Sequence, residues 1–243
     1  MRLRHITFTG IDARTDLQEL QDIQQQYPIA EFGVLTSYHW YENGNRYLNP
    51  YLIETQLRKR ILNLALHVCG RAAHDAAVGR WNLIDKLTWM NLGLFDRVQI
   101  NIANRKDNPE YIFKRAKIAE QEVIIQQRSA SDMPVYEATL LKFLFKQDRY
   151  NRTFSALLDS SGGQGIDTPI SIYQSAETIG YAGGISPDNV ADKLTYLFEN
   201  VRDGEFWIDM ESGVRTDDWF DLDKVRRVLE TCQPIIKEYS KGD

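Results

Sequence analysis

Short apolar runs alternate with amphipathic segments along the whole chain. Eight of these runs are strand-like, and their C-terminal ends are spaced roughly 25 to 34 residues apart, which suits a repeated strand, loop, helix and return. They occupy residues 6–9, 31–35, 64–68, 97–102, 122–126, 155–158, 178–182 and 205–209. Several are continuously apolar, as expected for parallel strands that are covered on both faces.

Three of the intervening segments show a clear helical period of apolar residues. They span residues 16–26, 186–201 and 221–237. Thr15 or Asp16 is a suitable N-cap for the first segment. Ser186 is a suitable N-cap for the second, because Pro187 follows it at the first helical position. We expect these helices to pack on the outside of a parallel sheet.

Eight βα units in 243 residues predict an α/β fold, a (β/α)8 TIM barrel that forms a single domain over residues 1–243. A doubly wound open sheet is the alternative, because the number of strands does not prove that the sheet closes. One connection is long for a βα loop and rich in aromatic residues, namely residues 37–49. Such loops on the C-terminal side of strands are candidate active-site lids.

The composition narrows the class of protein. A hydrophobic share of 43% supports a sizeable core, and no apolar run approaches the roughly 18 residues of a membrane span. The N-terminus lacks the apolar core of a signal peptide, so we expect a cytoplasmic protein without a membrane partner. A net charge of −5 argues against nucleic acid as a partner. Cys69 and Cys232 form neither a disulfide framework nor a metal-binding spacing, and we expect no cofactor or metal.

Three predicted strands run into loops of small residues, at residues 159–165, 181–190 and 207–214. Small residues let backbone N–H groups approach an anion closely, and helix N-termini add positive potential. In TIM barrels, phosphate is often held by the loops after strands seven and eight. The pattern predicts a phosphorylated small-molecule ligand held within residues 159–214, with Asp159 at the edge of its site. The alternative is that the glycine pairs only permit tight turns.

These loops resemble the motifs of phosphoribosylanthranilate isomerase, a TIM-barrel enzyme of tryptophan biosynthesis. That family converts an aminoaldose phosphate into an aminoketose by an Amadori rearrangement. Its sixth strand ends in Asp followed by Gly-Gly-Thr-Gly, similar to Asp159 and residues 162–165. Its Ala-Gly-Gly-Leu-x-Pro-x-Asn-Val pattern resembles residues 182–190, and its Asp-x-x-Ser-Gly-Val pattern resembles residues 209–214. Its Ser-Pro-Arg-Tyr-x-x-Pro segment resembles residues 44–50.

The resemblance implies a role for each matching residue. Asp159 would be the general acid that protonates the furanose ring oxygen, a role that needs a protonated carboxyl group. Arg46 would hold the anthranilate carboxylate, and Asp209 would contact the sugar hydroxyls or orient the site. The phosphate would be held by Ser212 and by the glycines Gly162, Gly163, Gly165, Gly183, Gly184 and Gly213. Plainer explanations exist: Asp159 caps a loop, Arg46 is a surface arginine, and Asp209 bonds backbone amides.

The general base of the family has no match in this chain. In the family the first strand ends in Lys-Ile-Cys-Gly, and the cysteine removes the C2 proton. Here residues 7–10 read Thr-Phe-Thr-Gly, so Thr9 takes the position of the cysteine. A threonine hydroxyl is too weak an acid to supply a base without an activating partner. The histidine often found at the family's fourth strand is also missing, because Asn101 takes its place.

Other residues are candidates for the missing base. Cys69 lies at the end of the third predicted strand and should face the same side as His67, although a small buried core cysteine is the alternative. Glu211 stands where the family usually has a small residue, beside Asp209. Two neighbouring carboxylates could create a base or a metal site, and an exposed loop charge is the simpler explanation.

The sequence therefore supports two hypotheses about function. The first is an isomerase-like enzyme that acts on a phosphorylated sugar conjugate, with Asp159 as the acid and Thr9 or Cys69 in the place of the base. The second is a non-catalytic or repurposed barrel that binds a phosphorylated ligand without the isomerase reaction. A Schiff-base aldolase on the same scaffold is disfavoured, because no predicted strand ends in a lysine.

Overall fold

Eight parallel strands close into a barrel in the order in which they occur along the chain, and β8 pairs with β1. The computed structural model describes residues 1–38, 44–60, 62–78, 80, 94–101, 122–134, 154–174, 178–202 and 204–240. The predicted TIM barrel is confirmed, and the open doubly wound sheet is excluded. The strands are β1 (Arg2–Thr9), β2 (Ala30–Thr36), β3 (Leu64–Val68), β4 (Arg97–Ile100), β5 (Glu122–Gln127), β6 (Phe154–Asp159), β7 (Ile179–Ala182) and β8 (Glu205–Met210).

The observed strands agree with the predicted ones to within a residue except at two: β1 begins at Arg2 rather than at Ile6, and β4 ends at Ile100, before the predicted end at residue 102. The first residues of β1 alternate polar and apolar side chains, and the apolar run alone therefore missed them. They pair with β8, and the register shifts between Leu3 and Ile6.

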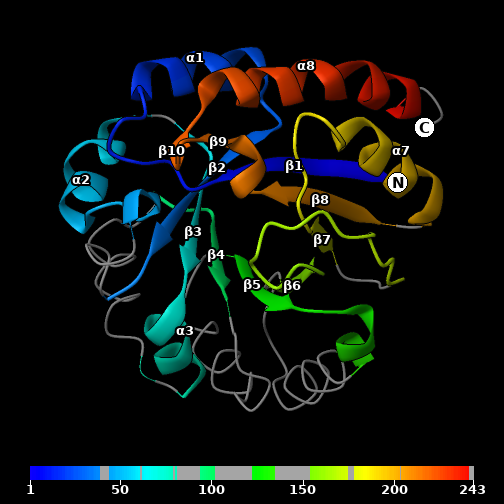
Figure 1. Cartoon of the computed structure of the whole chain (residues 1–243), viewed down its shortest axis with the longest axis horizontal. Coiled ribbons are helices and arrows are strands. Elements are labelled where there is room, and N and C mark those ends of the chain that lie inside the picture. Colours follow the sequence, from blue (N-terminus) through cyan, green and yellow to red (C-terminus); the bar gives the residue numbers. More distant parts are fainter. Residues whose placement is uncertain are drawn as a thin grey trace, which may run out of the picture.

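Helices cover the outside of the barrel, as Figure 1 shows for α1, α7 and α8. The helices are α1 (Leu17–Gln26), α2 (Pro50–Thr55), α3 (Gly70–Ala77), α7 (Val190–Asn200) and α8 (Leu222–Tyr239). Short 3₁₀ turns are η2 (Gly44–Arg46), η3 (Leu57–Lys59), η4 (Ala130–Asp132) and η5 (Ser212–Val214), and β9 (Arg215–Thr216) pairs with β10 (Trp219–Phe220) as a hairpin. Among the described residues, no helix has both the length and the apolar character needed to cross a membrane.

The helix caps agree with the sequence prediction at one of two sites. Asp16 caps α1 by accepting bonds from the N–H groups of Gln18 and Glu19. The other prediction is wrong, because α7 begins at Val190 and not after Ser186. Asn189 Oδ1 accepts a bond from the Ser186 N–H at 2.8 Å, which closes a turn before the helix starts. Asp221, for which no cap role was predicted, caps α8.

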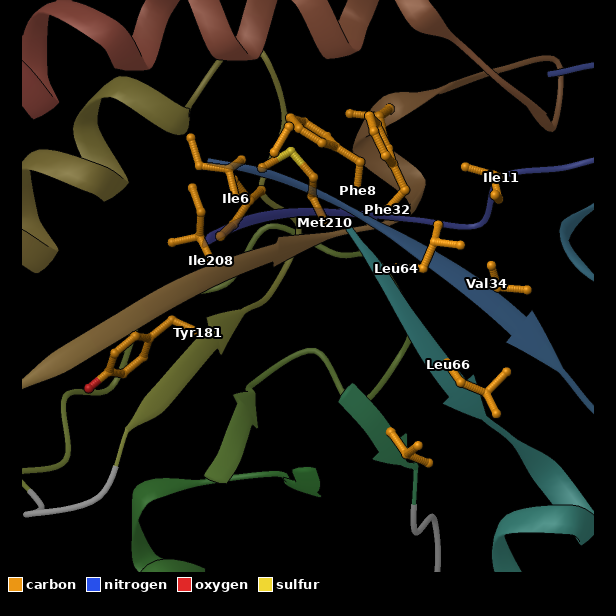
Figure 2. Close-up of a cluster of buried hydrophobic side chains, with 14 of the residues drawn as sticks. Ile6, Phe8, Ile11, Phe32, Val34, Leu64, Leu66, Tyr181, Ile208 and Met210 are labelled. Carbon is orange, nitrogen blue, oxygen red and sulfur yellow. The ribbon is translucent and has the colours of Figure 1, made fainter. Parts of the chain in front are cut away.

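The main apolar core lies between the outer face of the barrel and the helices. Figure 2 shows Phe8, Phe32 and Met210 together on the side of the strands that faces the C-terminal helix. Phe8 and Phe32 are fully buried, and their ring centroids are 6.2 Å apart. The close packing of this core holds the strands in place, and the C-terminal ends of the strands are therefore held rigidly at the mouth of the barrel.

The inside of the barrel is polar toward its N-terminal end. Arg97 on β4 is fully buried, stacks over the Trp207 ring at 4.4 Å, and has its Nε 3.4 Å from Glu31 Oε2. Thr7 donates a hydrogen bond to Glu31 Oε1 at 2.8 Å. TIM barrels usually fill this space with branched apolar side chains. In this protein a buried charge pair lies beneath the strand ends that form the candidate site.

Candidate active site

A cavity of about 330 Å³ opens at the C-terminal ends of the strands, and each of the eight strands contributes to its lining. All of the residues singled out from the sequence line this cavity. They are Thr9, Arg46, Cys69, Asp159, Gly162, Gly163, Gly165, Gly183, Gly184, Asp209, Ser212 and Gly213. The barrel thus brings together residues that are up to about 200 positions apart in the chain. Their catalytic and binding roles stay predictions.

Asp159, the last residue of β6, is 5% exposed and accepts four hydrogen bonds. Gln126 Nε2 and the Gly163 N–H donate to Oδ2 at 2.7 and 2.6 Å. The Ser161 N–H and Oγ donate to Oδ1 at 3.1 and 2.7 Å. The carboxyl group therefore caps the loop after β6, which was the plainer explanation, and lines the cavity at the same time.

Gln126 matters because Asp159 would have to carry a proton in order to act as an acid. A carboxylate offers about four acceptor sites, and the four donors occupy them. Two of these donors belong to side chains that can also accept a hydrogen bond: the Ser161 hydroxyl, and the Gln126 amide after it rotates to present its oxygen. Gln126 can therefore pair with either protonation state of Asp159.

Thr9 and Asp209 form a buried pair on neighbouring strands β1 and β8. Thr9 Oγ1 donates a hydrogen bond to Asp209 Oδ1 at 2.7 Å. Burial raises the pKa of Asp209 to about 7; the bond from Thr9 opposes the rise, while the carboxylates of Glu211 and Glu31 add to it. Asp209 is thus a carboxyl group that changes its charge near neutral pH.

His67 lies beside this pair and is also buried. Its Nδ1 is 3.9 Å from Asp209 Oδ2, which is too long for a hydrogen bond. Burial, with help from the charge of Arg97, lowers the pKa of His67 to about 3. The imidazole is therefore neutral at neutral pH, and its contact with Asp209 is not an ion pair. As the strand parity predicted, His67 and Cys69 both face the cavity.

Cys69 is surrounded by protein groups, although part of its surface faces the cavity. Its Sγ accepts a hydrogen bond from Asn101 Nδ2 at 3.2 Å. Burial raises the pKa of Cys69 to about 12, and the nearby carboxylate of Glu211 contributes to the rise. The thiol is therefore protonated at neutral pH, and this geometry argues against Cys69 as the general base.

Arg46, at the end of η2, has two acidic partners. Its Nη1 lies 2.9 Å from Glu211 Oε1, and its Nε lies 2.7 Å from Asp218 Oδ1. Nη1 is also 3.4 Å from Ser212 Oγ. Asp218 stands at a two-residue turn between β9 and β10, where Asp217 and Asp218 both have positive φ, as a type I′ turn requires. The arginine is therefore held at the cavity rather than free on the surface.

The loops after β6, β7 and β8 are packed against one another. A Cβ at Gly184, where φ is +64°, would lie 2.3 Å from the Asp167 backbone nitrogen. A Cβ at Gly213 would lie 2.1 Å from the Ile185 carbonyl oxygen. At these two positions the absence of a side chain lets the loops pack closely, and their predicted role in phosphate binding stays a prediction. Gly163 is different, because the space where its Cβ would lie is open.

Lys193 on α7 supports the same loops. The sequence alone did not point to it. Its Nζ donates to the carbonyl oxygens of Thr168 and Gly183 at 2.8 and 3.1 Å, and it lies 2.8 Å from Asp167 Oδ1. A lysine on a helix face gives no sign in the sequence that it will bond a distant loop. It adds a positive charge behind the predicted phosphate site.

Several further lining residues were not assigned to the site from the sequence, and most of those that can form hydrogen bonds lie near strand ends. They are Tyr47, Gln99, Asn101, Gln126, Arg128 and Ser161. A signal for two of them was available: Gln99 in the apolar strand β4 and Asn101 just after it are two residues apart and so face the same side. Within the described residues, no group of three His, Cys, Asp or Glu side chains could hold a metal ion.

Comparisons with known proteins agree with the motifs. The model of the family N-(5'phosphoribosyl)anthranilate (PRA) isomerase matches residues 117–231, just under half of the chain. The structure of N-(5'-phosphoribosyl)anthranilate isomerase from Pyrococcus furiosus superimposes with a TM-score of 0.56 and 18% identity, covering 95% of this chain and 98% of that one. The structure of phosphoribosyl anthranilate isomerase from Thermococcus kodakaraensis superimposes with a TM-score of 0.56 and 11% sequence identity, and the match covers 95% of this chain and 99% of that one. No curated protein matches. The resemblance inferred from the motifs is confirmed, and the structural matches establish the fold.

Proposed function

Starting from the resemblance of this chain to the PRA isomerase family, we propose that the protein is an aldose–ketose isomerase that performs an Amadori rearrangement on a phosphorylated sugar conjugate. The observation that carries the proposal is that two carboxyl groups, Asp159 and Asp209, face one cavity beside the small-residue loops of β7 and β8. An isomerase of this kind needs one group that donates a proton and one that accepts a proton.

In this proposal the phosphate lies against the loops after β7 and β8, where η5 begins at Ser212. The first N–H groups of a helical turn have no partner within the turn and can bond an anion. Lys193 adds positive charge from behind the β7 loop through its bond to the Gly183 carbonyl. These features support a phosphate group at this end of the cavity.

Asp159 acts as the general acid in the proposed reaction. It protonates the furanose ring oxygen, the bond from C1 to that oxygen breaks, and the nitrogen lone pair forms a double bond to C1. Gln126 turns its amide to accept from the protonated Asp159 before the transfer, and to donate to the carboxylate afterwards. Arg46 faces the same cavity, where its guanidinium suits a carboxylate on the non-sugar part of the substrate.

The proposal is tested by measuring turnover of phosphoribosylanthranilate by the purified protein. We expect Asp159→Asn to lower kcat/KM by about 10²- to 10⁴-fold, because the amide cannot donate the ring-opening proton. The matched control is Asp188→Asn, whose carboxylate is exposed and pairs with Arg227 on the surface. Absence of turnover by the folded wild-type protein across a panel of aminoaldose phosphates would overturn the proposed isomerase function.

A further inference from the structure

The hydroxyl of Thr9 is already used as a donor. It occupies the position at which the resemblance expects a base, yet its proton points to Asp209 Oδ1 at 2.7 Å. A threonine hydroxyl has a high pKa, and a carboxylate whose pKa is about 7 is too weak a base to remove its proton, so Thr9 does not become an alkoxide that could accept the C2 proton. Cys69 is protonated at neutral pH, because burial raises its pKa to about 12. Neither of the two candidates for the base is suited to accept a proton.

Asp209 differs from Asp159 in how its oxygens are bonded. Asp159 accepts four hydrogen bonds, whereas in the described part of the chain Asp209 accepts one side-chain bond, from Thr9. Asp209 Oδ2 lies 3.9 Å from His67 Nδ1, beyond hydrogen-bond range. The bond from Thr9 therefore fixes one oxygen of Asp209, and among the described side chains none donates to the other oxygen, in a residue that lines the cavity.

The two carboxyl groups stand at the same level of the barrel. Asp159 pairs with Ala182 on β7, and Tyr181 pairs with Ile208, so Ala182 and Asp209 are the next residues along β7 and β8. With neighbouring strands about 4.8 Å apart, the Cα atoms of Asp159 and Asp209 are roughly 10 Å apart. Ala182, on the strand between them, has a small side chain and also lines the cavity. In the proposed reaction the sugar would lie between these two carboxyl groups.

We infer that, in the proposed isomerase reaction on which this inference rests, Asp209 is the base that takes the proton from C2 of the sugar and Thr9 positions Asp209 for that step. The C2–H proton moves to Asp209, and the electron pair of that bond becomes the C1–C2 double bond. The electrons of the C1–N double bond return to nitrogen. The resulting enol then tautomerises to the ketone, so no oxidant or reductant is needed.

The charged groups around Asp209 support this role. Two carboxylates lie near it, Glu211 from the loop after β8 and Glu31 from β2, together with the guanidinium of Arg97 on β4. The neutral imidazole of His67 on β3 and the thiol of Cys69 just after β3 also lie near it. Burial raises the pKa of Asp209 to about 7 despite the bond from Thr9. A base with a pKa near the working pH is both largely ionised and strong enough to accept a proton from carbon.

The pH dependence of kcat/KM for phosphoribosylanthranilate tests the inference. In the wild type we expect kcat/KM to rise with pH through about 7, because Asp209 must be ionised. Asp209→Asn should lower kcat/KM by about 10²- to 10⁴-fold. Thr9→Val removes the bond that holds the pKa of Asp209 down, so the rise should move to higher pH. Thr9→Ser keeps the hydroxyl and should restore the wild-type profile.

Matched controls lie outside the cavity. Thr231→Val on α8 removes a hydroxyl that donates to the Arg227 carbonyl within the same helix, and Asp188→Asn removes an exposed carboxylate. Both should leave the profile unchanged. Thr9→Val provides an independent measurement should Asp209→Asn fail to fold.

The outcomes separate this inference from the proposed function. Wild-type turnover that survives in Asp209→Asn within about tenfold, or a profile that Thr9→Val does not move, overturns the inference and leaves the isomerase function intact. Loss of activity in Cys69→Ser together with an active Asp209→Asn would assign the base to the thiol instead. Absence of turnover in the wild type overturns the proposed function, and this inference with it.

Discussion

Glu211 stands where the related family usually has a small residue, and its carboxylate lies 2.9 Å from Nη1 of Arg46. Arg46 is also paired with Asp218 at 2.7 Å. A substrate carboxylate that binds to Arg46 would therefore have to come close to these two protein carboxylates. Burial raises the pKa of Glu211, and the positive charge of Arg46 opposes that rise. At the scale of single residues, the pairing of Arg46 limits which substrates the cavity accepts.

We predict that Glu211→Gln strengthens binding of a substrate that carries a carboxylate on its non-sugar part. The substitution removes a negative charge next to Arg46, and partly exposed ion pairs of this kind contribute up to about 1 kcal/mol. KM for phosphoribosylanthranilate should fall by about two- to fivefold. Glu199→Gln, on the exposed end of α7, is the matched control. A KM that stays constant or rises would show that the substrate does not displace Glu211 from Arg46.

The β9–β10 hairpin and helix α8 form a unit that places Asp218 against Arg46. Asp221 connects the two elements, because its Oδ1 accepts the Lys224 N–H at 3.0 Å and its Oδ2 accepts Thr216 Oγ1 at 2.5 Å. Arg215 ties the same hairpin to β1, since its Nη1 and Nη2 donate to the Gly10 carbonyl and to Asp12. At the scale of elements, the cap of the last helix therefore supports the mouth of the cavity.

We predict that Asp221→Ala destabilises the protein by about 1 kcal/mol, the usual cost of losing a helix N-cap. Asp223→Ala, in the first turn of the same helix but outside the cap position, is the control and should cost less. Urea unfolding measures both values. Equal costs for the two variants would show that the cap of α8 contributes nothing of its own.

At the scale of the whole molecule, the closed barrel holds ionisable groups away from water. Arg97 and Glu31 lie near the N-terminal end of its interior, and His67 and Asp209 lie beneath the cavity. Burial raises the pKa of Asp209 to about 7 and lowers that of His67 to about 3. A buried carboxyl group whose pKa is raised by folding lowers the stability of the folded protein at any pH where the carboxyl group must be ionised.

We predict that Asp209→Asn is more stable than the wild type at pH 8. The folded protein holds a proton on Asp209 up to about pH 7, whereas the unfolded chain loses it near pH 4, so the wild type loses stability as pH rises between these values. The gain in the variant has an upper limit of about 4 kcal/mol at pH 8 and should vanish near pH 4. His67 makes stability rise with pH, the opposite of Asp209, but it is present in both proteins, so its contribution cancels in the difference between them.

Unfolding free energies at pH 4, 6 and 8 give the comparison, with Asp188→Asn as the control for the Asp-to-Asn change on the surface. A difference between Asp209→Asn and the wild type that is independent of pH would mean that Asp209 is ionised throughout. That result would also remove the support that its titration gives to the proposed proton transfer.

The sequence by itself determined the positions of the strands and the residues that gather at their C-terminal ends, and it favoured a barrel over an open sheet. Apolar runs predict strands because each strand buries its side chains on both faces, whereas the closure of the sheet was decided by the pairing of β8 with β1. The prediction failed where the signal was weak: at the polar start of β1, and at Ser186, where a side chain of Asn189 closes a turn before the helix. Residues 39–43 of the candidate lid, within 37–49, lie outside the described residues, so its role stays a prediction.

Only the tertiary structure decided which partners these residues have. Thr9 bonds Asp209 across 200 positions of sequence, and Arg46 meets Glu211 across 165, because β8 closes on β1. Periodicity reports which way a side chain points, but not which distant side chain it will meet. The pairing determines the charge of a carboxyl group through burial and hydrogen bonds. A substitution that looked in the sequence like the loss of a base is thus, in the fold, a hydroxyl that holds a carboxyl group in place.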